Sequence, residues 1–177
     1  FWFPLETTLA GGATNNAGYQ IYYGNPDAGT PDVNINDIFL PLADANTRGL
    51  WRFNENSGTV IHDLSGRNHS GTFYNGAWTD GLMGWAGSFN GSSSFVQIAH
   101  SDDFKPGAIT LEAWVYLTGS TRDYPMVFNK DRYYLRINGN SQVLFSIKAD
   151  GGDRKLSSTT ELDLYRWYHV AATYNGG

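Results

Sequence analysis

The chain has 177 residues, of which 41% are hydrophobic and 15% aromatic, with 21 glycines and no cysteine. This apolar content is sufficient for a buried core, and the excess of glycine and aromatic residues favours an all-β fold. The net charge of −5 comes without a long run of either sign, which argues against a nucleic-acid-binding surface with clustered basic residues. The lack of cysteine excludes disulfide bonds and thiolate chemistry.

The first 48 residues carry few strand signals. Tyr19–Tyr23 (YQIYY) predicts one short strand, which the turn-forming residues 24–27 (GNPD) end. Prolines and asparagines scattered through residues 31–48 indicate a linker. No stretch of about 18 apolar residues exists that could span a bilayer, so we expect no membrane insertion in this piece.

From Gly49 onward, apolar runs recur between clusters of Gly, Asn, Asp and Ser, as is typical of a sandwich of short strands. The turn residues 138–140 (NGN) predict a hairpin between two of these runs. The candidate strands are Leu50–Phe53, Thr59–Asp63, Gly71–Tyr74, Ala86–Asn90, Ser94–His100, Ala108–Leu117, Met126–Asn129, Tyr133–Ile137, Gln142–Lys148 and Trp167–Tyr174.

The longest candidate, Ala108–Leu117, has two different faces because side chains alternate along a strand. A strand that is apolar on one face and aromatic and polar on the other is typical of a two-layer sandwich. The pattern therefore predicts that this strand lies in the middle of one of the two sheets. The apolar set is Ile109, Leu111, Ala113, Val115 and Leu117, and the opposite set is Thr110, Glu112, Trp114 and Tyr116.

The order of several short motifs resembles the laminin-G-like jelly roll of the concanavalin A-like lectin/glucanase superfamily. The resemblance covers roughly residues 49–177 and implies an all-β, two-sheet antiparallel jelly-roll sandwich. The motifs that carry it are Gly49–Glu55 (GLWRFNE), Asp63–Gly71 (DLSGRNHSG), Phe89–Gly91 (FNG), Phe95–Val96, Pro106–Gly107, Thr110–Val115 (TLEAWV) and Trp167–Tyr174 (WYHVAATY).

The organisation of the chain follows from this resemblance and one other. Tyr22–Pro26 (YYGNP) resembles the last strand of an uncharacterised extracellular β-domain found upstream of such modules. We therefore interpret residues 1–30 as the C-terminal tail of an upstream β-domain, 31–48 as a linker and 49–177 as the laminin-G-like domain. The start at Phe1 and the turn signal at the other end lead us to expect an internal piece of a longer polypeptide, with the jelly roll C-terminally truncated.

Some jelly rolls of this superfamily are glucanases, which need three carboxylates at alternating positions of one strand. The one candidate pair here is Glu161 and Asp163, and the following positions hold Tyr165 and Arg166 in place of a third acid. Retaining hydrolysis fails without a proton donor. The four histidines also lack the spacing of zinc ligands. We therefore predict that the chain is not an enzyme.

The loop Asp63–Gly71 combines a carboxylate, a hydroxyl and an amide, which are oxygen ligands of the kind that calcium prefers. The resemblance implies that members with this D-x-S-G-x-x-N pattern often bind calcium there, helped by acids after the F-[DN]-G turn. Residues 92–94 are all serine here, so that help is weak. We predict an optional structural Ca²⁺ bound by Asp63, Ser65 and Asn68. Alternatively, Asp63 and Asn68 bond their own backbone in turns.

Two polar loops, 118–125 and 149–155, are the predicted ligand-binding rim of the sandwich. Aromatic rings there could stack on sugars while charged side chains hold the hydroxyls. Alternatively, the tryptophans of the rim only close a loop over the sheet, while Trp51, Trp114 and Trp167 are expected in the core. The predicted ligand-binding residues are Trp78, Trp85, Arg122, Asp123 and Tyr124.

Together these features predict a non-catalytic recognition module in a larger multidomain protein that is secreted or held at the cell surface. Its expected partner is a polysaccharide or another protein, not nucleic acid. Two alternatives remain open: a structural spacer in an adhesin-like stalk, and an accessory module of a glycoside hydrolase whose catalytic domain lies outside this piece.

Overall fold

The computed structural model describes residues 43–119, 125–149 and 152–176. The chain divides into two compact units, Phe1–Ala45 and Asn46–Gly177, and every strand of the described residues belongs to the second. The predicted strand Tyr19–Tyr23 lies outside the described residues. The division into tail, linker and domain after residues 30 and 48 therefore stays a prediction.

The described residues form β-strands and one short 3-10 turn, with no α-helix among them. The first group of strands is β1 (Val60–Ile61), β2 (Gly71–Tyr74), β3 (Ala77–Asp80), β4 (Trp85–Ser88) and β5 (Phe95–Ile98), followed by the turn η1 (Asp102–Phe104). The second group is β6 (Ile109–Tyr116), β7 (Met126–Lys130), β8 (Tyr133–Ile137), β9 (Gln142–Ala149), β10 (Gly152–Glu161) and β11 (Trp167–Tyr174).

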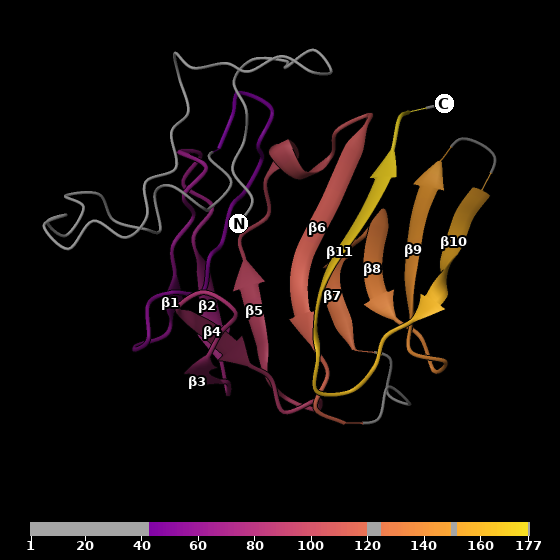
Figure 1. The fold of residues 1–177 in the computed structure, drawn as a ribbon. Coiled ribbons are helices and arrows are strands. Elements are labelled where there is room, and N and C mark those ends of the chain that lie inside the picture. Colours follow the sequence, from indigo (N-terminus) through magenta and orange to yellow (C-terminus); the bar gives the residue numbers. More distant parts are fainter. Residues whose placement is uncertain (1–42, 120–124, 150–151, 177) are drawn as a thin grey trace, which may run out of the picture. The chain divides into compact units, whose positions relative to one another are not determined.

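These strands pair antiparallel throughout, in the sheet orders β1-β2-β5, β10-β9-β8-β7, β11-β6 and β3-β4 (Figure 1). Within the described residues no helix is long and apolar enough to cross a membrane. The predicted all-β antiparallel fold is confirmed.

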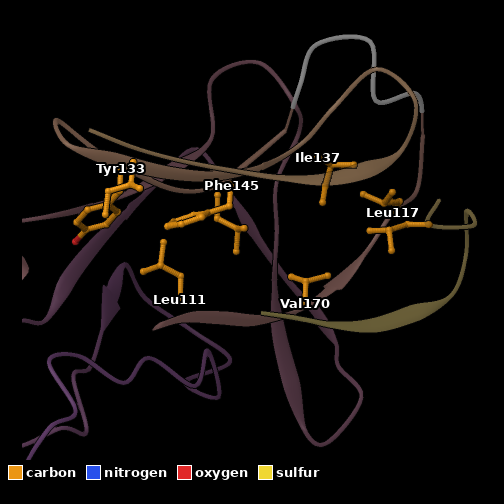
Figure 2. Close-up of a cluster of buried hydrophobic side chains, with 9 residues drawn as sticks. Leu111, Leu117, Tyr133, Ile137, Phe145 and Val170 are labelled. Atoms are coloured by element: carbon orange, nitrogen blue, oxygen red, sulfur yellow. The ribbon is translucent and has the colours of Figure 1, made fainter. Parts of the chain in front are cut away.

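The main core lies between the β6–β11 pair and the sheet that contains β8 and β9 (Figure 2). Leu111 and Val170 point from one layer toward Tyr133, Ile137 and Phe145 on the other. Leu135 on β8 is fully buried, at 0% exposure. The alternation predicted for Ala108–Leu117 is confirmed, because Leu111 and Leu117 are buried whereas Glu112 and Trp114 are exposed.

A smaller aromatic cluster forms where the β3–β4 hairpin packs near β2. The Phe73 ring lies 5.2 Å from Phe89, 5.6 Å from Trp78 and 6.2 Å from Phe53, measured between ring centroids. Tilted and edge-on rings of this kind pack favourably beyond their burial alone. This cluster fixes β3, β4 and the segment before β1 to the sheet.

The prediction that Leu50–Phe53 forms a strand was wrong. Only Trp51 makes a β-bridge, to Asp63. Phe53 has a φ of 55° and Asn56 one of 57°, which take the backbone out of the extended region. The chain turns there, and the Phe53 ring joins the aromatic cluster instead.

Two strands were not predicted. β3 pairs with β4 through a turn in which Gly81 donates its N–H to the Gly84 carbonyl, with Gly84 at a φ of 82°. β10 pairs along β9, so most of the predicted loop 149–155 is a strand. Its side chains are nearly all exposed, and it is held to β9 mainly by the backbone ladder, together with a hydrogen bond from the Val143 N–H to the Ser158 hydroxyl.

Truncation of Leu135 to Ala tests the position of the core. We expect a loss of about 2–5 kcal/mol in the free energy of unfolding, because the substitution leaves a cavity in the core between the two layers. Leu156→Ala on β10 is the matched control, since Leu156 is 73% exposed and its loss should change stability by less than about 0.5 kcal/mol. If urea unfolding shows the same loss of stability for Leu135→Ala and Leu156→Ala, this position of the core is contradicted.

Candidate functional site

The Asp63 carboxylate accepts four hydrogen bonds from its own loop and the preceding segment. Its Oδ1 accepts from the backbone N–H of Leu50 at 3.0 Å and of Ser65 at 2.9 Å. Its Oδ2 accepts from the Ser65 hydroxyl at 2.7 Å and from the His69 N–H at 2.8 Å. One side chain therefore holds three separate stretches of backbone together.

The pKa of Asp63 reflects these bonds. Burial is the largest single influence and by itself raises the pKa, but the bonds donated by Leu50, His69 and Ser65 together outweigh it. The pKa of Asp63 is therefore held below its ordinary value, because these bonds stabilise the ionised form.

The same loop is joined to η1 by an ion-pair cluster around Asp103. The Asp103 carboxylate lies 2.9 Å from His69 Nε2 and 3.7 Å from the Arg67 guanidinium. The hydrogen bond with His69, and secondarily the Arg67 charge, holds the pKa of Asp103 below its ordinary value. The His69 ring also packs on Phe104, with 4.6 Å between centroids, and its backbone carbonyl accepts from Trp51 Nε1.

This geometry bears on the predicted calcium ligands Asp63, Ser65 and Asn68. Each carboxylate oxygen of Asp63 already accepts two hydrogen bonds, so a cation would have to displace at least one donor. Asn68 has a φ of 62°, the left-handed conformation that asparagine tolerates in turns. No group of three His, Cys, Asp or Glu side chains suited to a metal occurs within residues 43–119, 125–149 and 152–176. The arrangement favours the turn-forming role, and calcium binding stays a hypothesis.

The Phe89–Gly91 motif forms a second side-chain-centred turn. Asn90 Oδ1 accepts from the backbone N–H groups of Ser92, Ser93 and Ser94 at 2.9–3.1 Å. Gly91, at a φ of 74°, supplies the left-handed residue that this turn needs. The motif therefore closes the connection between β4 and β5.

The structure brings Trp78 and Trp85 to one face of the β3–β4 hairpin. Asp80, two residues after Trp78 on β3, pairs with Trp85. Trp78 packs edge-on against Phe73 and donates its indole N–H to the Gly58 carbonyl, so its ring serves the aromatic cluster. Trp85 keeps 38% of its surface exposed. The other predicted ligand-binding residues, Arg122, Asp123 and Tyr124, lie outside the described part of the chain.

The acidic pair Glu161 and Asp163 does not lie on one sheet face. Glu161 ends β10, and Asp163 lies in the turn that follows. The Asp163 carboxylate accepts a 2.8 Å hydrogen bond from the Tyr168 hydroxyl, and the Arg166 guanidinium lies 3.9 Å away. Asp163 thus stabilises the connection before β11.

The sequence analysis assigned no binding role to the exposed aromatic surface formed by β6 and β11, which we call the β6–β11 outer face. The register pairs Trp114 with His169 and Tyr116 with Trp167, and the ring centroids of each pair are 5.3 Å apart. The face consists of Thr110, Glu112, Trp114 and Tyr116 on β6 and Trp167, His169, Ala171 and Thr173 on β11.

The expectation that Trp114 lies in the core was wrong. Trp114 is 51% exposed, because its neighbours Ala113 and Val115 face the core and strand parity directs Trp114 the other way. Trp51 and Trp167 are half-buried. The alternation already visible in Ala108–Leu117 was the signal that could have identified Trp114 as a surface residue.

Asp63→Asn tests the role of the Asp63 loop. The substitution replaces one carboxylate oxygen by an –NH₂ group, which accepts no hydrogen bond. The two bonds that this oxygen accepts are therefore lost, and we expect a loss of about 1–3 kcal/mol in the free energy of unfolding at pH 7. Because the folded-state pKa values of Asp63 and Asp103 are lowered, their stabilisation is complete above about pH 5 and is lost as the pH falls below about 4. The variant should therefore lose less stability than the parent on acidification.

Asp131→Asn in the exposed turn between β7 and β8 is the control and should change the free energy of unfolding at pH 7 by less than about 0.5 kcal/mol. Calcium titration of EDTA-treated protein separates the two roles of the loop. A rise in Tm with millimolar calcium that Asp63→Asn abolishes supports a bound cation. An unchanged Tm, with Asp63→Asn still destabilised, leaves only the turn-forming role.

Comparison with known proteins gives one family. Residues 90–177 match the family described as the concanavalin A-like lectin/glucanases superfamily. No curated protein and no solved structure matched the chain. The match begins at the Asn90 turn and spans β5 to β11, whereas the resemblance of residues 49–89 stays a prediction. Residues 90–177 are therefore similar to the concanavalin A-like lectin/glucanases superfamily, and the antiparallel strands and the two-layer core agree with a fold of that kind.

Proposed function

We propose that the chain is a non-catalytic recognition module that binds carbohydrate and belongs to a larger extracellular or cell-surface protein. The observation that carries this proposal is the exposure of aromatic side chains on strands, next to polar side chains that can hydrogen-bond. Trp114 and Tyr116 are 51% and 40% exposed. Rings placed in this way offer stacking surfaces for sugars, while neighbouring hydroxyl, carboxylate and imidazole groups can bond hydroxyls.

The lack of catalytic activity is supported by the positions of the acids. On the β6–β11 outer face Glu112 is the one carboxylate, and the other residues of the face supply no second acid. Asp163 is engaged by Tyr168 in a turn. Glycoside hydrolysis with retention or inversion needs two carboxyl groups facing one bond, and the described residues do not assemble such a pair on this face.

A partner protein is the second candidate ligand. The outer face of β1, β2 and β5 supports it, because the rings of Tyr74 and Phe95 stack there with centroids 4.9 Å apart beside the exposed Val60. An exposed apolar patch of this kind is typical of an interaction surface.

A glycan array combined with a reducing-sugar assay tests the proposal. We expect the 177-residue chain to bind at least one group of glycans and to release no reducing ends from the polysaccharides that it binds. Release of reducing ends that is lost in Glu112→Gln or Glu161→Gln would contradict the non-catalytic assignment. Failure to bind any glycan would favour protein recognition or the structural spacer.

A further inference from the structure

The β6–β11 outer face has an ordered arrangement of rings and polar groups. Tyr116 and Trp167 form one cross-strand row, and Trp114 and His169 form the next. Successive rows on one face of a sheet are about 6.8 Å apart, which is two residues of an antiparallel strand. The rings therefore form a strip along the strands and not an isolated contact.

The rings of this strip are held in place before any ligand binds. Each of the two aromatic pairs is tilted by 45–50° at a centroid separation of 5.3 Å, and both belong to a ladder paired continuously from Ile109 to Tyr116. Cross-strand pairs restrict each other's rotamers. Aromatic side chains that are ordered but exposed lose little conformational entropy on binding, which favours affinity.

Polar groups continue the strip toward the other end of the strands. Glu112 Oε2 lies 3.5 Å from His169 Nε2, directly beside Trp114. In the last row the hydroxyls of Thr110 and Thr173 lie 3.0 Å apart. The face therefore passes from rings to hydrogen-bonding groups along one direction.

We propose that the β6–β11 outer face is the carbohydrate-binding surface and that its ligand is a neutral polysaccharide. Pyranose rings stack on Trp114, Tyr116 and Trp167, and Glu112, His169 and the two threonines bond hydroxyl groups of adjacent sugars. This proposal rests on the proposed function and adds its site and its class of ligand.

The charge of the face favours a neutral polymer over an acidic one. Glu112 carries the one carboxylate of the strip, and the chain as a whole has a net charge of −5. Both repel sulfated or uronic-acid polymers. A dry protein interface fits this face less well, because it would bury Glu112 and His169, which have side-chain exposures of 54% and 44%.

The other exposed aromatic positions fit a sugar less well. Tyr74 and Phe95 stack on each other with an interplanar angle of 23°, so each covers one face of the other's ring. Trp78 is packed against Phe73, which leaves Trp85 as the exposed ring of that hairpin. These positions supply matched controls.

The experiment is affinity electrophoresis of the full 177-residue chain in gels that contain one soluble polymer each. The neutral polymers are a β-glucan, a xyloglucan, a galactomannan and an arabinoxylan, and the acidic ones are heparin and polygalacturonate. We expect retardation by at least one neutral polymer and none by the acidic ones. Trp114→Ala and Trp167→Ala should each weaken this binding by about tenfold or more, as is typical of tryptophans at binding hot spots.

Phe95→Ala and Trp85→Ala are the controls and should bind like the parent. Trp114→Phe keeps a ring at the same position and should retain most of the affinity, which preserves the test if Trp114→Ala fails to fold. Thermal melts identify variants that have lost their structure.

The outcomes separate the site from the function. If neutral polymers still bind Trp114→Ala and Trp167→Ala like the parent, this site is overturned and the proposed function stands. The same conclusion follows if Trp85→Ala or Phe95→Ala abolishes the binding instead. Retardation by heparin or polygalacturonate alone overturns the neutral class of ligand. No retardation by any polymer overturns both this inference and the carbohydrate function.

Discussion

The packing of the β6–β11 pair against β8 and β9 is the interaction on which the rest of the structure depends. Leu111 and Val170 from one layer and Leu135 and Phe145 from the other fill the space between the sheets. Burial of such side chains contributes about 1.5–3 kcal/mol each, whereas an exposed ion pair contributes about 0–1 kcal/mol. The register of β6 with β11 is set by this burial, because a slip of one strand by one residue would turn either Leu111 or Val170 outward.

The same constraint produces the β6–β11 outer face. When Leu111, Ala113 and Val115 face the core, strand parity leaves Glu112, Trp114 and Tyr116 no direction but outward. A surface in which large rings are exposed and ordered needs a rigid support, and the core beneath it supplies one. The candidate binding surface and the stability of the fold thus arise from one pattern of alternation.

How much could be predicted from the sequence depended on whether a segment had a buried face. β2, β8 and β11 have the predicted bounds, because apolar side chains on one face mark them clearly. The first part of β10 was predicted to be a loop, since Gly152–Glu161 is mostly polar on both faces and pairs with β9 mainly through its backbone. Leu50–Phe53 looked like a strand, but the positive φ of Phe53 has no signature in its residue type.

The candidate site could also be predicted only in part. The Asp63 loop was recognised from its residue types, but whether its oxygens serve a cation or the backbone depends on donors as distant as Leu50 and His69. Trp114 was assigned to the core because tryptophan is usually buried, although the alternation of its own strand pointed outward. The alternation of side chains along the strand was therefore a better guide to the burial of Trp114 than its residue type.

Because the chain contains no cysteine, single-cysteine variants measure the central claim most directly. Leu111→Cys and Glu112→Cys are adjacent on β6, with Leu111 8% exposed and the Glu112 side chain 54% exposed. We expect a thiol reagent to label Glu112→Cys rapidly in native protein, whereas Leu111→Cys should react at a comparable rate only after unfolding in denaturant. Equally rapid labelling of Leu111→Cys in native protein would contradict the two-layer core and the surface built on it.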